Sequence, residues 1–209
     1  IIFVKKLTGT SDWPVYASGL TSAAYRLVLS SSDAQSTTND EWNSTAPTST
    51  VISVGSGGNV SDNGATFIAY CFTSISGFSK MGSYNGSGSD GNVVATGFKP
   101  SWVMIKRSNS SGGWLIFDSA RSPSNPVNDR LEANNDQAEQ TNSGDKFLDF
   151  NATDFEANGS DSELNASGGT YIYMAYKENP AQYAIPSGQM GYLLAAGGGG
   201  SGADSGGGA

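Results

Sequence analysis

Short apolar runs separated by turn-forming residues dominate residues 77–180. Runs rich in β-branched and aromatic residues, bounded by Gly, Ser, Asn and Pro, are typical of β-strands joined by tight turns. Trp102 to Ile105 is apolar throughout, which predicts a strand covered on both faces, and Trp114 to Phe117 follows as its hairpin partner. The pattern predicts strands at 78–84, 93–98, 102–105, 114–117, 130–133, 146–150, around 155 and at 170–176. This density of short strands indicates a β-sandwich.

The same pattern occurs twice along the chain. Matched segments lie 101 residues apart early in each copy and 104 residues apart further on; they are Val4–Lys6 with Ile105–Arg107, Trp13 with Trp114, and Thr66–Ile68 with Thr170–Ile172. A period of this length is too long for a solenoid unit and matches one small domain. We therefore predict an all-β protein with two tandem, jelly-roll-like β-sandwich repeats, at residues 1–75 and 76–180.

The first copy starts in the middle of this plan, because Ile1 aligns with Trp102. The segment equivalent to residues 78–101 has no counterpart, and a sandwich without its N-terminal strands has unpaired strand edges. We expect the missing strands to lie upstream in a longer parent protein or to be donated by a neighbouring molecule.

Residues 181–209 have a different character. They contain Gly197–Gly200 and Gly206–Gly208, and such a stretch cannot bury enough side chain to form its own core. Two interpretations stay open: a flexible linker, or a polyproline-II-like glycine strand that packs against copies of itself. In both, we expect this segment to act as a connector and not as an active site.

Charge and composition exclude several classes of protein. The formal net charge of −8 argues against binding to nucleic acid or to an anionic membrane, because both would repel the chain. The chain contains no run of 18 apolar residues, so the sequence predicts no transmembrane helix. The chain has no histidine, which removes the commonest general base and the usual zinc sites. Its one cysteine, Cys71, lies between Tyr70 and Phe72, and we expect a buried thiol.

Several segments resemble the repeated domain of phage tail-fibre and related virion structural proteins. They are Gly97–Arg107, Gly113–Arg121, Asn128–Leu131 and Gly169–Tyr176 in the second copy, and Trp42–Ser49 and Val51–Gly55 in the first. Tyr192–Gly200 separately resembles the opening of glycine-rich regions in tail-fibre and adhesin proteins. The resemblance covers about residues 1–180. It implies a location in the virion and a parallel homotrimer that contacts other virion proteins through the glycine-rich end. It supplies no catalytic residue and no cofactor.

The aromatic residues divide into two groups. Those at matched positions in the copies, or in the predicted strands, are expected to form the structural core; they are Trp13, Tyr16, Trp114, Phe117, Tyr171 and Tyr173. Trp42 differs, because its counterpart at the 104-residue spacing is Lys146 and it follows Asp40 and Glu41. An aromatic face beside carboxylates suits stacking on a sugar ring, so Trp42 is a candidate for glycan binding, with local packing as the alternative.

Acidic residues in the second copy suggest a metal site or a glycosidase. Asp145, Asp149 and Asp154, or the pair Asp161 and Glu163, offer oxygen ligands for calcium or two carboxylates for glycoside cleavage. None matches the twelve-residue calcium loop, and unpaired surface carboxylates are expected in a chain this acidic. We therefore expect no metal site, no cofactor and no enzymatic activity.

Two classes of function fit these observations. The first is a non-enzymatic virion structural protein, a segment of a phage tail fibre or related fibre that extends and presents a host-binding tip. The alternative is an extracellular adhesin or filament subunit of cellular origin whose repeats bind surface glycans. An enzyme such as a capsule depolymerase comes third.

Overall fold

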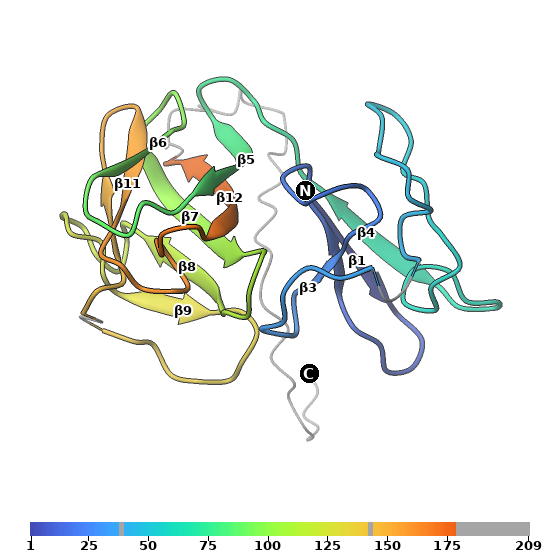
Figure 1. Cartoon of the computed structure of the whole chain (residues 1–209). Coiled ribbons are helices and arrows are strands. Elements are labelled where there is room, and N and C mark those ends of the chain that lie inside the picture. Colours follow the sequence, from blue (N-terminus) through green and yellow to red (C-terminus); the bar gives the residue numbers. More distant parts are fainter. Residues whose placement is uncertain (38–39, 142–143, 179–209) are drawn as a thin grey trace, which may run out of the picture. The chain divides into compact units, whose positions relative to one another are not determined.

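The computed structural model describes residues 1–37, 40–141 and 144–178 (Figure 1). Over these ranges the protein is all-β. The strands are β1 (Ile2–Lys6), β2 (Pro14–Tyr16), β3 (Leu27–Val28), β4 (Phe67–Cys71), β5 (Ser79–Asn85), β6 (Asn92–Ala95), β7 (Pro100–Arg107), β8 (Trp114–Asp118), β9 (Arg130–Glu132), β10 (Phe147–Phe150), β11 (Asp154–Asn158) and β12 (Thr170–Lys177). The described ranges include no helix of the length and apolarity needed to cross a membrane.

The strands form three antiparallel sheets. The first sheet has the order β3-β2-β1-β4, the large sheet β5-β12-β7-β8-β9 and the small sheet β10-β11-β6. Each strand expected in residues 77–180 is present within a few residues, and β7 and β8 form the expected hairpin, with Met104 opposite Ile116. β7 starts at Pro100, before the expected Trp102. A proline is tolerated at the first position of a strand, where no ladder hydrogen bond needs its missing N–H.

The first sheet and four strands of the large sheet share their order and register. β3-β2-β1-β4 corresponds to β9-β8-β7-β12. The pair Phe3–Val15 becomes Met104–Ile116 at the 101-residue spacing, and Phe3–Tyr70 becomes Met104–Met174 once the 104-residue spacing applies to β12. The pairing of β2 with β3 matches that of β8 with β9 in the same way. The spacings found in the sequence are therefore also spacings between equivalent positions in two sheets.

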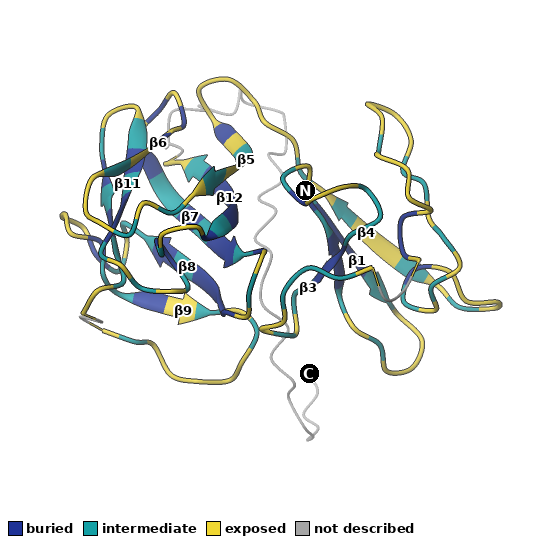
Figure 2. Ribbon diagram, viewed as in Figure 1, coloured by how far each residue is buried: buried dark blue, intermediate teal, exposed yellow. Residues whose placement is uncertain are grey.

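The large and small sheets pack face to face, as in a β-sandwich, over one apolar core (Figure 2). Three of the aromatic residues expected in a core lie there, fully or almost fully buried: Phe117, Tyr171 and Tyr173. Phe155 from the small sheet meets Tyr173 edge-on at 5.3 Å between ring centroids. Strand alternation explains this core, because every second side chain of β7, β8 and β12 points to the same face.

A second core joins the first sheet to the other face of the large sheet. Phe3, Val15 and Leu27 pack with Trp114, Ile172 and Met174. The Trp114 indole Nε1 donates a hydrogen bond of 2.9 Å to the Val28 carbonyl. Contacts of this kind group Ile1–Glu178 into one compact unit.

Residues 1–75 form one sheet, and loop residues cover its second face. Trp42 and Val60 pack there against Ile2 and Val4. The segment equivalent to β10 and β11, near residues 43–54, contains no strand. Among its described residues the first half therefore has no small sheet of its own. The subdivision at residues 75 and 76 stays a prediction, and the glycine-rich segment 181–209 lies outside the described residues.

Candidate functional site

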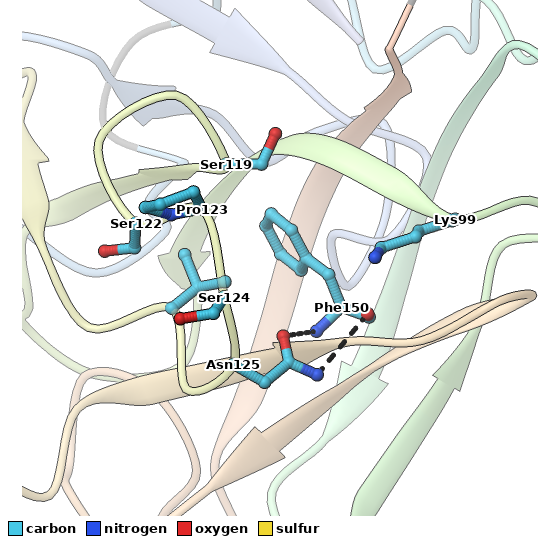
Figure 3. A pocket seen from close by; sticks show the side chains of 8 residues that line it. Lys99, Ser119, Ser122, Pro123, Ser124, Asn125 and Phe150 are labelled. Carbon is cyan, nitrogen blue, oxygen red and sulfur yellow. Dashed lines mark hydrogen bonds between the residues drawn. The ribbon is translucent and has the colours of Figure 1, made fainter.

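A hollow of about 170 Å³, lined by both polar and apolar residues, lies where the loop after β8 meets β10 (Figure 3). It is lined by Lys99, Ser119, Ser122, Pro123, Ser124, Asn125, Val127 and Phe150. Ligand pockets for drug-sized molecules are usually about 300 Å³ or larger. The hollow therefore suits one small polar group, about the size of a single sugar ring or smaller.

Asp118 and Arg121 hold the loop that forms one wall of the hollow. The Asp118 carboxylate accepts hydrogen bonds from the backbone N–H groups of Ala120 and Arg121, at 3.1 and 2.9 Å. The Arg121 guanidinium donates to Asp118, to Glu139 and to the Ile116 carbonyl. A short polar side chain that bonds to backbone two and three residues ahead is the usual way to fix such a turn.

Two of the polar side chains in the hollow serve the fold. The Asn125 amide accepts a hydrogen bond of 2.9 Å from the Phe150 N–H and donates one of 3.4 Å to the Phe150 carbonyl (Figure 3). The Ser122 hydroxyl accepts a hydrogen bond from the Asp129 N–H at 3.1 Å. The side chains of Lys99, Ser119 and Ser124 make no hydrogen bond or ion pair within the described ranges. An ammonium group and two hydroxyls can bind a polar or anionic group, and they form no nucleophile–base pair.

Trp42, the candidate for glycan binding, lies in the interior. Its side chain is 1% exposed and packs against Ile2, Val4 and Val60, with Tyr16 edge-on at 5.8 Å. Both faces of the indole are covered by protein, so no face is open to a sugar ring. The surroundings of Trp42 are those of a residue with a local packing role.

The carboxylate beside Trp42 is buried as well. Glu41 is 1% exposed; its Oε1 lies 3.4 Å from an Arg26 guanidinium nitrogen and accepts a hydrogen bond of 3.1 Å from the Asn59 amide. A buried charge is tolerated when it is paired and hydrogen-bonded. Of the residues that suggested a sugar site, Glu41 and Trp42 are thus buried in the first half, and Asp40 is exposed.

Most of the other candidate acidic residues have neighbouring partners. Asp149 accepts a hydrogen bond from the Asn158 amide, and Asp154 accepts from Asn151. Glu163 pairs with Lys146 and accepts a 2.7 Å hydrogen bond from the Gly113 N–H. Asp161 accepts from the Glu163 N–H at 2.8 Å. In the described ranges no three acidic or cysteine side chains are grouped as a metal site would require.

The electrostatics around Glu163 favour its charged form. Burial raises the pKa of this carboxyl, but the hydrogen bonds from Lys146 and the Gly113 N–H, together with the nearby positive charges of Lys146 and Arg130, leave its pKa below the usual value. A general acid in a glycosidase needs the opposite shift. The pair Asp161 and Glu163 therefore serves as an anchor for Lys146.

Lys106 is a buried cation outside the set of candidate residues that the sequence suggests. Its side chain is fully buried, and its Nζ donates to the Ser32 carbonyl at 3.2 Å and to the Arg107 carbonyl at 2.7 Å. Burial lowers its pKa to about 8, while the negative charges of Glu163 and Asp33 act in the opposite direction. The signal was present in the sequence, because Lys106 directly follows an apolar run that predicts a strand covered on both faces.

The two matched tryptophans have the same backbone contact and different side-chain surroundings. The carbonyl of Trp13 accepts from the Leu29 N–H, and that of Trp114 accepts from the Ala133 N–H. Trp114 is fully buried, whereas Trp13 is half-buried and stacked on Tyr70 at 6.4 Å. Tyr16, also expected in the core, is half-buried beside Trp42.

The expectation of a buried Cys71 is wrong. Cys71 is exposed at the end of β4. The equivalent residue of the second half, Ala175, is fully buried beneath the small sheet. In the described residues the first half has no small sheet, and the loop residues that cover Ile2 and Val4 on this face leave Cys71 exposed.

These features define an all-β protein with two sheets of matching order and register. Over residues 1–180 the chain matches a family described as "Domain of unknown function (DUF7483)", and it belongs to that family. No curated protein and no solved structure matches the chain.

Proposed function

We propose that this protein is a non-enzymatic structural segment of a virus particle, part of a phage tail fibre or related fibre that extends and presents a host-binding tip. The observation that carries the proposal is the face-to-face packing of two sheets with the same order and register. We take these sheets to be two tandem copies of one β-unit. Because one copy buries its apolar face against the next, such units stack in series and add length.

The resemblance of Gly97–Arg107 and Gly113–Arg121 to the repeats of tail-fibre proteins supports this proposal. In the structure these segments include β7 and β8, whose side chains fill both cores. The resembling residues thus include the ones that specify the fold. Engagement of Asp161 and Glu163 with Lys146 agrees with a structural use of the acidic residues.

The test locates the protein on particles. Phage particles whose genome encodes the chain are purified and incubated with gold-labelled antibodies raised against the whole chain. The labelled particles are then imaged by electron microscopy. We expect label along fibres, together with peptides of the chain in mass spectra of the same particles. Particles that lack these peptides would overturn the proposal.

We propose that the assembled form is a homotrimer. Apolar side chains at exposed positions, among them Leu7, Val51 and Ile75, supply surface that subunit contacts would cover. Sedimentation of the full chain at micromolar concentration should give three times the 21.6 kDa chain mass. A monomer at that concentration contradicts this assembly.

The alternative function, an adhesin whose repeats bind surface glycans, is favoured by one observation. The hollow presents Lys99, Ser119 and Ser124 without protein partners in the described ranges. Binding of the full chain to a glycan array, with loss of binding in Lys99→Ala and retention in Lys177→Ala, another exposed lysine, would support it. An array without binding above background would remove this alternative.

A further inference from the structure

The first sheet has an open edge at the position where the large sheet has a paired strand. β4 pairs with β1 on one side, and no described strand pairs with its other side. Its counterpart β12 pairs with β7 on one side and with β5 on the other, over seven residue pairs from Thr170–Asn85 to Tyr176–Ser79. The first sheet thus has every strand of the matching set except an equivalent of β5.

β4 differs from its counterpart β12 in the exposure of its side chains. Three exposed residues of β4 have buried counterparts at the 104-residue spacing (Figure 2): Ile68 with Ile172, Ala69 with Tyr173, and Cys71 with Ala175. β4 therefore combines the composition of an interior strand with the exposure of an edge strand.

β4 has none of the features that normally protect an edge. Natural edge strands carry charges, prolines, glycines or bulges, or are very short. Phe67–Cys71 has no charged residue, proline or glycine, and it is five residues long. By contrast, the edge strand β5 contains Lys80 and Gly82, and β9 contains Arg130 and Glu132. Among the described edge strands, β4 is the longest one without a charged residue.

We propose that β4 binds an additional antiparallel β-strand of the β5 type, supplied by another repeat of this family. The strand extends the first sheet in the way that β5 extends the large sheet. Main-chain hydrogen bonds provide the affinity, and the alternating side chains provide the selectivity.

The structure also indicates how this strand differs from β5. Gly82 lies opposite Tyr173, and a Cβ atom at Gly82 would be 2.9 Å from the Tyr173 ring. The first sheet has Ala69 in place of Tyr173, so the space that Tyr173 fills is open there. A strand with a large side chain at the position of Gly82 therefore fits β4 better than β5 itself.

The test uses the exposed thiol of Cys71 as a reporter on the full chain. The probes are synthetic peptides with the sequence of residues 77–87, unchanged or with Gly82→Tyr or Gly82→Pro. Alkylation of Cys71 by N-ethylmaleimide and hydrogen exchange of amides 67–71 are followed by mass spectrometry. We expect the Gly82→Tyr peptide, at saturation, to slow the alkylation of Cys71 and the exchange of amides 67–71 by about tenfold. The reason is that a docked strand hydrogen-bonds to the backbone groups at the open edge of β4. The unchanged peptide should act at higher concentration, and the proline peptide should have no effect.

Two variants of the chain localise the effect. Ala69→Lys places a charge on exposed β4 and should abolish protection, whereas Leu131→Lys, a matched change at an exposed position of the edge strand β9, should retain it. Thermal unfolding is measured for both variants to check that they fold. Unchanged Cys71 alkylation and exchange at saturating peptide would overturn the proposal.

Discussion

The buried ammonium group of Lys106 should make the stability of the folded protein depend on pH. Its folded-state pKa of about 8 lies below the ordinary value of 10.5 because the ammonium is buried between the first and large sheets. Below pH 8 the lysine is charged in both states, and the folded protein bears the whole cost of burying that charge. Lowering the pKa from 10.5 to about 8 corresponds to about 3 kcal/mol.

The sign of the effect follows from proton binding. Between pH 8 and about 10.5 the unfolded chain still holds the proton that the folded protein has lost, so stability rises with pH. Burial raises the pKa of Tyr84, of Tyr173 and, to about 12, of Tyr176, so above about pH 10 the unfolded chain loses tyrosine protons first and stability falls. The window for Lys106 is therefore pH 8 to about 9.5, with an expected gain of about 1.5 kcal/mol.

The perturbation is Lys106→Met, which keeps the length of the side chain and removes its charge. Urea unfolding at a series of pH values, under reducing conditions, gives the free energy of unfolding of each form. The unchanged chain should gain stability across the window, and Lys106→Met should not. Lys5→Met, at the matched half-buried position, is the control and should retain the gain. A flat or falling stability of the unchanged chain, or a rise that persists in Lys106→Met, would refute the reasoning.

Three further predictions concern the two cores and the backbone. Phe3→Ala removes a ring that contacts Trp114, so it should lower the free energy of unfolding by about 3–5 kcal/mol. In urea the variant should unfold in one transition at a lower concentration, and two separate transitions would contradict the shared core. Glu41→Gln removes the buried charge 3.4 Å from Arg26 and should cost about 3–5 kcal/mol in guanidinium unfolding; a loss below about 1 kcal/mol would show that the pair is dispensable. Gly159→Ala and Gly97→Ala both place a Cβ atom on a residue with positive φ, and this backbone strain should cost each variant about 1–2 kcal/mol of stability. Only the Cβ atom at position 159 would also lie 2.2 Å from a backbone oxygen, that of Asp145. The Gly159 variant should therefore melt well below the Gly97 variant, and equal melting temperatures would contradict the contact.

Strand positions could be predicted from the sequence because they depend on local information. Short apolar runs bounded by turn residues located β7, β8 and β12, and the spacings of matched residues coincide with those between equivalent positions of the two sheets. A hairpin such as β7–β8 needs only its own residues and one turn. These elements are therefore written in short stretches of sequence.

Burial of single side chains could not be predicted, because it depends on which layer lies above them. Cys71 has apolar neighbours as a core residue would, and it is exposed because no small sheet covers the first half. Trp42 has acidic neighbours as a binding residue would, and it is buried because its loop folds back over β1. The partners of Lys106 come from distant segments, among them Ser32, so no local pattern shows them.

The central position of β12 affects how the chain folds as it is synthesised. β12 lies between β5 and β7, so Tyr171 pairs with both Tyr84 and Arg107. Ribosomes deliver β5 and β7 first, and neither gains its shared neighbour until residues 170–177 have emerged. Pairings between such distant segments are slow, because a long loop must close before they form. During that interval β5 has no partner strand and β7 is paired only with β8, and this is the stage at which the nascent chain depends most on chaperones.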